Sequence, residues 1–78
     1  MSNLLDILNV IMDHINNKVY ELRKDINVTQ EDLAKAVNVS RQTIIAIEKG
    51  NYTPSLLLGL KIAKFFKKSV EEVFVYKY

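Results

Sequence analysis

Residues 28–50 read VTQEDLAKAVNVSRQTIIAIEKG, and this stretch predicts two short helices joined by a tight turn. Thr29 can cap the first helix, because Asp32 follows three residues later in a capping-box arrangement. Asn38 stands where the chain leaves that helix, and asparagine tolerates the left-handed conformation that such an exit often needs. Ser40 then caps a second helix over residues 41–49, and Gly50 follows at the usual position of a glycine C-cap.

The second of these helices has distinct inner and outer faces. Ala34 is small where two crossing helices must approach closely, and Val37 faces Ile44 and Ile47 across the turn. Burial of these apolar residues fixes the rotation of the second helix against the first. The residues left pointing outward are Arg41, Gln42, Ile45, Ala46 and Lys49. The pair is therefore a helix-turn-helix candidate.

The outward residues have the chemistry of a DNA reader. In a helix-turn-helix protein the front of the second helix enters the major groove. Arg41 can make two hydrogen bonds to guanine, Gln42 can do the same with adenine, and Ala46 or Ile45 can meet a thymine methyl group. Side chains and backbone amides near helix N-termini can hold phosphates, and the residues at these positions are Gln30, Ser40 and Thr43.

The composition allows such a partner and excludes several other functions. A chain of 78 residues forms one domain, and the absence of cysteine removes disulfides, thiolate metal ligands and thiol nucleophiles. All 11 lysines and arginines lie in residues 18–78, together with 7 of the 9 acidic residues. The other two acidic residues, Asp6 and Asp13, come earlier. A mildly basic body permits a polyanionic partner without requiring one.

No sequence pattern indicates an enzyme. Phosphate-binding glycine loops, metal signatures and nucleophile-base patterns are all missing from the sequence, so we predict no catalytic activity, cofactor, metal or small-molecule ligand. His14 has no second histidine or cysteine to act with, which favours a surface or dimer-interface role. The apolar start LLDILNVIM is too short to cross a bilayer and lacks the flanks of a signal peptide. We therefore expect a soluble, cytoplasmic protein with no membrane partner.

The segments on either side of the central pair also read as helical. Apolar residues from 2 to 25 recur at steps of three and four, which predicts either one helix or two helices separated at Asn16-Asn17. After the central pair, Thr53 and Pro54 are expected to open a helix whose core side is lined by Leu56, Leu57, Leu60, Ala63 and Phe66. A solvated face, rather than a phosphate-binding stripe, is expected of Lys61, Lys64, Lys67 and Lys68.

The end of the chain predicts one more helix and an ambiguous tail. Ser69 and Glu72 form a second capping-box pattern, which opens a short helix through about Phe74. The tail FVYKY alternates apolar and polar-tipped residues, as a short strand or a frayed end would.

The sequence from residue 18 to about residue 75 resembles the lambda-repressor-like, Cro/Xre-type helix-turn-helix family. The resemblance rests on VTQEDLAKAVNVSRQTIIAIEKGNYTPSLLLGLKIAKFFKKSVEEVF, which spans the two helices, the loop after them and both later helices. It is closest to the small stand-alone regulators of bacteria and archaea. The resemblance implies an all-α, five-helix fold that binds operator DNA as a dimer.

The family also implies roles for individual residues of this chain. Base readout would come from Arg41, Gln42 and Ala46, and phosphate contacts would come from Gln30, Ser40, Thr43, Asn51 and Tyr52. We add Lys49 to the phosphate contacts and Ile45 to base readout. An ion pair between Arg23 and Glu48 would tie the first helix to the recognition helix. The sequence departs from the family in having Asn38 in place of the usual turn glycine, and in having residues 1–16.

Residues 1–16 are predicted to be a helical extension for dimerisation, ahead of a DNA-binding domain over residues 17–78. The extension has more apolar side chains than a small domain needs to cover, so it either wraps back on the domain or is buried against a second chain. We favour the homodimer, with an interface formed by Leu4, Leu5, Leu8, Ile11, Met12 and Ile15. The predicted function is thus a homodimeric repressor of a pseudo-palindromic operator. The alternative is an antitoxin-like or anti-repressor module whose residues 1–16 bind a partner protein.

Overall fold

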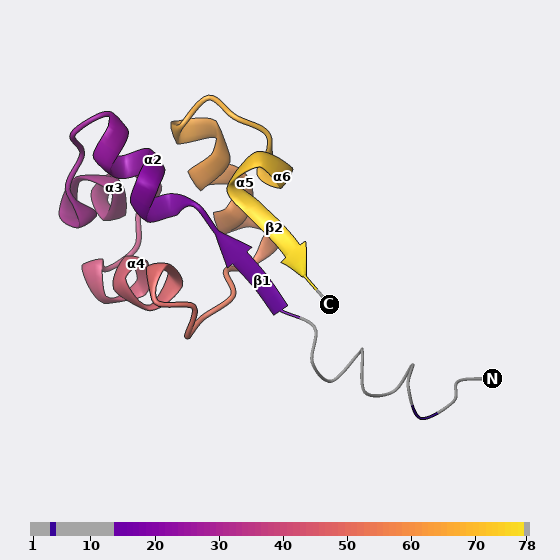
Figure 1. Cartoon of the computed structure of the whole chain (residues 1–78). Coiled ribbons are helices and arrows are strands. Elements are labelled where there is room, and N and C mark those ends of the chain that lie inside the picture. The colour runs from indigo at the N-terminus through magenta and orange to yellow at the C-terminus, as the bar shows by residue number, and fades with distance from the viewer. Residues whose placement is uncertain (1–3, 5–13, 78) are drawn as a thin grey trace.

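The computed structural model describes residue 4 and residues 14–77 of the chain. In chain order the described elements are β1 (His14–Asn17), α2 (Val19–Asp25), α3 (Gln30–Val37), α4 (Arg41–Glu48), α5 (Leu56–Phe65), α6 (Val70–Val73) and β2 (Phe74–Lys77). Figure 1 shows the helices gathered into one body, from which the two strands extend side by side. Leu4 is helical and exposed.

One apolar core lies inside the helical body. Its largest fully buried side chains come from every helix: Val19, Leu33, Ile44, Ile47, Ile62 and Val73. Val37 and Ala34 join them, and Leu22, Val28 and Phe66 pack around the edge of the cluster. The predicted anchoring of α4 through Ile44 and Ile47 is therefore confirmed.

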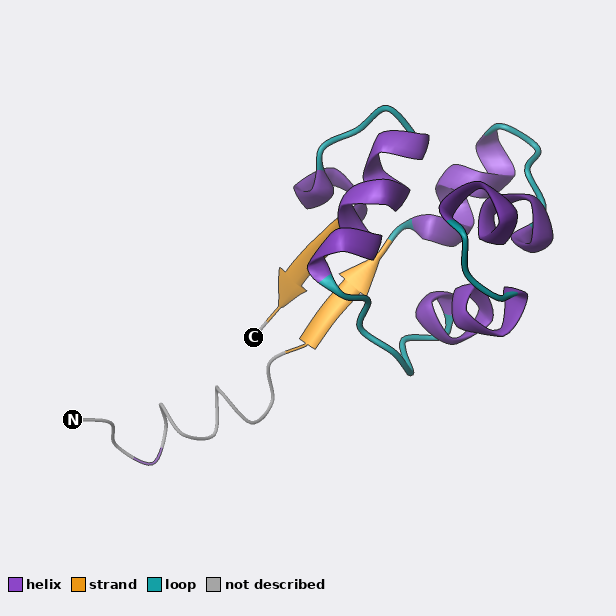
Figure 2. Ribbon diagram, turned by 180° about the vertical axis from the view of Figure 1, so that it is seen from behind, coloured by secondary structure: helices purple, strands orange, loops and turns teal. Residues whose placement is uncertain are grey.

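The first and last described elements pair as a two-stranded antiparallel sheet, visible at the edge of the body in Figure 2. The register places His14 opposite Lys77 and Asn17 opposite Phe74. Immediately beyond this pairing, the Lys18 amide donates to the Val73 carbonyl at 2.9 Å. The FVYKY tail is thus a strand over residues 74–77, one of the two possibilities left open from the sequence.

The sheet also corrects the prediction for the N-terminal segment. The helical extension was predicted to reach residue 16, but residues 14–17 form β1, so a single helix over residues 2–25 is wrong. A break at Asn16-Asn17 is present, as the second alternative predicted, but these residues are part of a strand that precedes α2. The physical reason is that Ile15 is β-branched and Asn16 and Asn17 are weak helix formers, while the tail offers a partner strand rich in β-forming residues. Among the predicted dimerisation residues, Ile15 is in this strand and Leu4 is helical, whereas Leu5, Leu8, Ile11 and Met12 lie outside the described residues.

The predicted start of α5 is wrong, and so is its predicted core side at Leu56, Leu57 and Leu60, whereas Ala63 is buried and Phe66 packs against the core as predicted. The helix begins at Leu56 with Ser55 as its cap, since the Ser55 hydroxyl accepts from the Leu58 amide at 3.1 Å, and Thr53-Pro54 precede it as loop. The buried face is formed by Leu58, Gly59, Ile62 and Ala63, whereas the exposed fractions of Leu56, Leu57 and Leu60 are 74%, 64% and 48%. Five of the first six positions of LLLGLK are apolar or glycine, so periodicity could not identify which side faces the core.

Candidate nucleic-acid interface

The turn between α3 and α4 is built by local side-chain hydrogen bonds. The Asp32 amide donates to the Thr29 hydroxyl at 3.0 Å, and the Thr29 amide donates back to the Asp32 carboxylate at 3.2 Å, which completes the predicted capping box. The backbone hydrogen bond from Thr29 holds the pKa of the exposed Asp32 carboxyl below its usual range. Asn38 ends α3 in the left-handed conformation, with φ 62° and ψ 50°. The predicted cap and turn are therefore confirmed.

The rotation of α4 follows from its buried side. The Ser40 hydroxyl accepts from the Thr43 amide at 3.2 Å and begins the helix, and Gly50 leaves it at φ 79°. Ile44 and Ile47 are 0% and 1% exposed against α3. Because those two positions are inward, the front of the helix presents Arg41 and Gln42 as exposed side chains, with Ile45 and Ala46 half-buried behind them.

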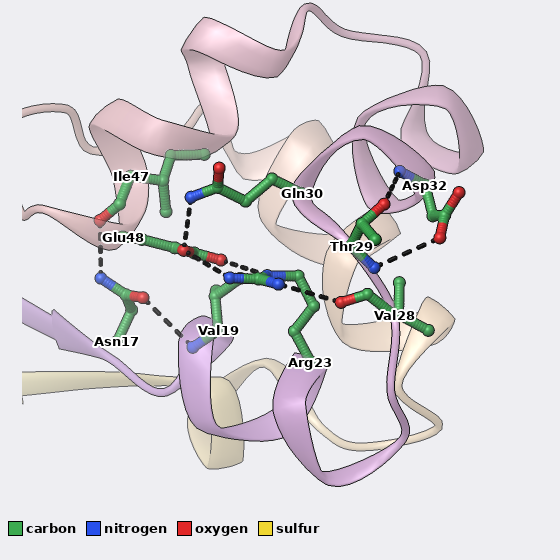
Figure 3. Close-up of polar contacts among 9 residues, drawn as sticks. All are labelled: Asn17, Val19, Arg23, Val28, Thr29, Gln30, Asp32, Ile47 and Glu48. Carbon is green, nitrogen blue, oxygen red and sulfur yellow. Dashed lines mark hydrogen bonds and ion pairs between the residues drawn. The ribbon is translucent and has the colours of Figure 1, made fainter.

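A buried ion pair ties α2 to the end of α4. Arg23 Nε donates to Glu48 Oε2 at 2.7 Å and Arg23 Nη2 donates to Glu48 Oε1 at 3.1 Å, with only 7% and 6% of the two side chains exposed. Figure 3 shows the guanidinium lying between this carboxylate and the Val28 carbonyl, which accepts from Nη1 at 2.9 Å. The hydrogen bond to Glu48 raises the pKa of Arg23 above its already high usual value, so the guanidinium stays charged. This is the pair that the family resemblance implies.

Two further amides extend this network to the neighbouring elements. Gln30 Nε2 donates to Glu48 Oε1 at 3.0 Å, so the first residue of α3 is bound to the last residue of α4. Asn17 Nδ2 donates to the Ile47 carbonyl at 2.8 Å, while Asn17 Oδ1 accepts from the Val19 amide at 3.2 Å (Figure 3). Asn17 thereby joins β1, α2 and the last turn of α4, a role that sequence reasoning missed. The signal was present in the capping preference of asparagine, but its long-range partner was not visible in the sequence.

The remaining predicted DNA contacts surround this rigid unit. Ser40, Lys49, Asn51 and Tyr52 are exposed, whereas Thr43 is half-buried with its hydroxyl 3.1 Å from that of Ser40. Gln30 is half-buried and its Nε2 already donates to Glu48. The individual roles of these residues in DNA binding stay predictions.

An open hollow beside the front of α4 brings further polar residues to the same side. It has a volume of about 480 Å³ and is lined by Arg41, by Thr29–Glu31 at the start of α3, by Arg23 and Lys24 of α2, and by Asn27 and Val28 of the α2–α3 connection. Lys24 and Asn27 were not among the predicted site residues, because their distance in sequence from Arg41 hides their closeness in space. The polar side chains and the lysine of this lining suit a phosphate backbone, although Glu31 also lines the hollow.

Other kinds of site find no support in the part of the chain described by the structure. Among those residues, no group of three or more histidine and acidic side chains is placed to hold a metal ion. Within the same residues, none of the helices has both the length and the apolar character needed to cross a membrane.

Known proteins similar to this chain share its sequence pattern and its fold. A family model described as helix-turn-helix matches residues 19–73. An HTH-type transcriptional regulator of Methanocaldococcus jannaschii is 59% identical over 63 residues, which cover 81% of this chain and 96% of that protein. The cryptic phage CTXphi transcriptional repressor RstR of Vibrio cholerae is 33% identical over 58 residues, which cover 74% of this chain and 52% of RstR. The crystal structure of the restriction-modification controller protein C.AhdI from Aeromonas hydrophila has a TM-score of 0.66 and 29% identity, and the match covers 70% of this chain and 83% of C.AhdI.

Proposed function

This chain belongs to the Cro/Xre-type helix-turn-helix family of transcriptional regulators, and from that membership we propose that it is a homodimeric repressor that recognises a pseudo-palindromic operator. The family is one of DNA-binding regulators and not of enzymes, so the site should be judged by how it reads DNA. Residues 17–78 are the DNA-binding domain in this proposal, and residues 1–16 contribute to dimerisation.

The observation that carries the proposal is the exposed polar front of α4 on a rigid base. Arg41 and Gln42 are exposed, while Ile44 and Ile47 in the same helix are buried and Glu48 is held by Arg23 and Gln30. Such a base holds the backbone of α4 in position before DNA binds, so the helix itself does not have to become ordered on binding. Arg41 would recognise guanine, Gln42 adenine, and Ala46 or Ile45 a thymine methyl group.

The phosphate contacts in this proposal come from residues around that front. They are Gln30, Ser40, Thr43, Lys49, Asn51 and Tyr52, with Lys24 and Asn27 added by the hollow beside Arg41. The two lysines in this set, Lys24 and Lys49, would release counterions on binding DNA, so affinity should fall as salt concentration rises. The excess of basic over acidic residues after residue 17 is consistent with that behaviour.

A two-fold arrangement supports the operator symmetry. Two copies related by a two-fold axis would present two α4 helices about 34 Å apart, which is one turn of DNA. Repression is favoured by the similarity to the repressor RstR. The site of action would be the cytoplasm, where the DNA of bacteria and archaea lies.

In vitro selection of DNA from a random pool tests sequence-specific binding directly. We expect one enriched site with two inverted halves, and we expect Arg41→Ala together with Gln42→Ala to abolish the preference for it. Lys35→Ala is the matched control, because Lys35 is an exposed residue in the last turn of α3 and is not among the proposed DNA contacts. Failure to enrich any sequence, or binding that ignores the double substitution, would contradict the proposal.

A further inference from the structure

Three leucines of α5 face solvent together, and we call them the α5 stripe. Leu56, Leu57 and Leu60 have exposed fractions of 74%, 64% and 48%. Their spacing of three and four residues makes them neighbours on one side of the helix. Single exposed leucines are common on protein surfaces, but a contiguous apolar group of this kind marks an interaction surface.

The stripe continues onto the sheet through an apolar hollow. The hollow has a volume of about 140 Å³ and is lined by Leu56 and Gly59 of α5, Pro54, Val70, Phe74 and Ile15. This volume is close to that of a protein cavity that holds one benzene molecule, so an apolar side chain of a partner fits it. Ile15 of β1 is itself 39% exposed, which extends the apolar surface to the first strand.

The charges around this surface indicate an acidic partner. Lys61 and Lys64 of α5 and Lys67 and Lys68 after it are all exposed, and residues 54–70 contain no aspartate or glutamate. The first 17 residues have the opposite character, because they contain Asp6 and Asp13 and no lysine or arginine. Residues 4–12 of the same segment are mostly apolar, with Leu5, Leu8 and Met12 at steps of three and four.

We propose that the α5 stripe and its hollow receive residues 4–13 of a second copy of this chain, and that the second copy receives the same segment in return. This deepens the homodimer of the proposed function, on which it rests, by naming the surface that the dimerising segment contacts. The family model begins at residue 19, so the helix-turn-helix unit does not itself require this segment. When each copy places its segment on the stripe of the other, the two contacts are equivalent, as they are in a closed two-fold dimer.

The direction of β1 favours a second copy over the same copy as the source of the segment. Figures 1 and 2 show that β1 begins at the end of the sheet away from α2 and runs toward α2. Extended backward beyond His14, the line of β1 leads away from the helical body. We therefore assign the segment on the α5 stripe to a second copy, and the cross-linking test below decides between the two sources.

The first test measures the molar mass of the full chain in solution by light scattering. The wild-type chain should have the mass of a dimer, which is twice the chain mass of 9.0 kDa. The double variant Leu57→Glu, Leu60→Glu should have the mass of a monomer, and so should the double variant Leu8→Glu, Met12→Glu. Ile26→Glu is the matched control, because Ile26 is 54% exposed outside the stripe and its change should leave the dimer intact. A dimer that survives the Leu57 and Leu60 changes would overturn the proposal.

The second test identifies which copy supplies the segment, using the absence of native cysteine. Leu57→Cys is combined in turn with Leu5→Cys, Leu8→Cys and Met12→Cys, and each full chain is oxidised. At least one combination should give a covalent dimer that separates on reduction. An internally bridged monomer, or no bridge in any of the three, would overturn the proposal.

DNA binding separates this inference from the proposed function. Monomeric Leu57→Glu, Leu60→Glu protein should still bind a single half-site, with an affinity that depends on Arg41. A wild-type dimer that selects no DNA would instead contradict the proposed function while leaving the interface supported.

Discussion

At the scale of single residues, Arg23 joins α2 to the recognition helix. It is a buried cation that donates to two oxygens of Glu48 and to the carbonyl of Val28, and its guanidinium lies 5.4 Å from the centre of the Tyr20 ring. Buried ions are stable only when their partners are present, because each has lost its hydration. The two ends of this pair come from α2 and α4, so the position of the recognition helix depends on them.

We predict that Arg23→Met lowers the free energy of unfolding by about 3–5 kcal/mol, because it leaves Glu48 as a buried carboxylate without its main partner. Urea unfolding followed by circular dichroism measures the change. Arg23→Met combined with Glu48→Leu should cost much less, since no isolated charge remains. Equal losses of unfolding free energy in the single and double variants would show that the unpaired charge of Glu48 does not cause the destabilisation.

At the scale of elements, the helices begin and end at short sequence signals, while their faces are chosen by packing. Three of the five described helices that follow β1 start with a capping serine, and α3 starts with Thr29. Gly59 shows the second effect, because it is buried in α5 against α6 and β2 although nothing local requires a glycine.

Gly59→Ala should stabilise the protein by about 0.5–1 kcal/mol, because alanine is more favourable than glycine in the interior of a helix. The added Cβ would lie 3.8 Å from side-chain atoms of Phe74 and Val70, which is an ordinary contact distance. Gly50→Ala is the opposite control and should destabilise by about 1 kcal/mol, since Gly50 has φ 79°. Thermal melts of both variants measure the changes, and a lower melting temperature for Gly59→Ala would contradict the packing described for α5.

The two capping boxes predict a pH dependence of stability. Backbone hydrogen bonds from Thr29 and Ser69 lower the pKa of Asp32 and of Glu72, respectively, in the folded chain. A group with a depressed folded pKa stabilises the fold above its unfolded pKa, and this contribution is lost as pH falls through the folded value. The free energy of unfolding should therefore decrease below about pH 4.

Denaturant unfolding at pH 3 and pH 6 tests this dependence. Asp32→Asn with Glu72→Gln should reduce the difference between the two pH values, because the amides still accept hydrogen bonds but do not titrate. Glu31→Gln with Glu71→Gln is the matched control, since these exposed neighbours are not the acceptors of the caps. An unchanged difference in the first variant would assign the pH dependence to other carboxylates.

At the scale of the whole molecule, the DNA-reading front and the apolar surface belong to adjacent elements. The chain passes from Lys49 at the end of α4 to Leu56 at the start of α5 through one short loop. A dimer held through α5 would thus keep the two recognition helices at a fixed separation. The spacing of the operator half-sites should then be strict.

Inserting 5 base pairs between the half-sites of the selected operator should weaken binding by at least about tenfold, because it turns one half-site to the opposite side of the duplex. Fluorescence anisotropy at constant salt measures the affinity. A single half-site is the control and should bind about as weakly as the altered operator. Equal affinity for the original and altered operators would mean that the two copies do not bind as one rigid unit.

Much of this fold and of its site was predictable from the sequence. The match of the family model and the shared fold confirm the Cro/Xre-type resemblance and the five-helix class. Thr29, Asn38, Ser40 and Gly50 were read correctly because caps and turns depend on contacts within a few residues. Ile15, Asn17 and the leucines of α5 were not, because their environments depend on strands and helices far away in the chain.

The sequence by itself therefore determined the helix-turn-helix, its caps, its buried anchor and the residues that face outward from α4. These features follow from hydrogen bonds within a few residues and from apolar residues whose spacing places them on one face of each helix. Only the tertiary structure decided that β1 pairs with β2, that Asn17 holds the end of α4, and that the α5 stripe faces solvent. Strand pairing joins residues 14–17 to residues 74–77, and the first five residues of α5, LLLGL, are apolar or glycine on every side. The local pattern therefore left these environments open, and packing against distant elements decided them.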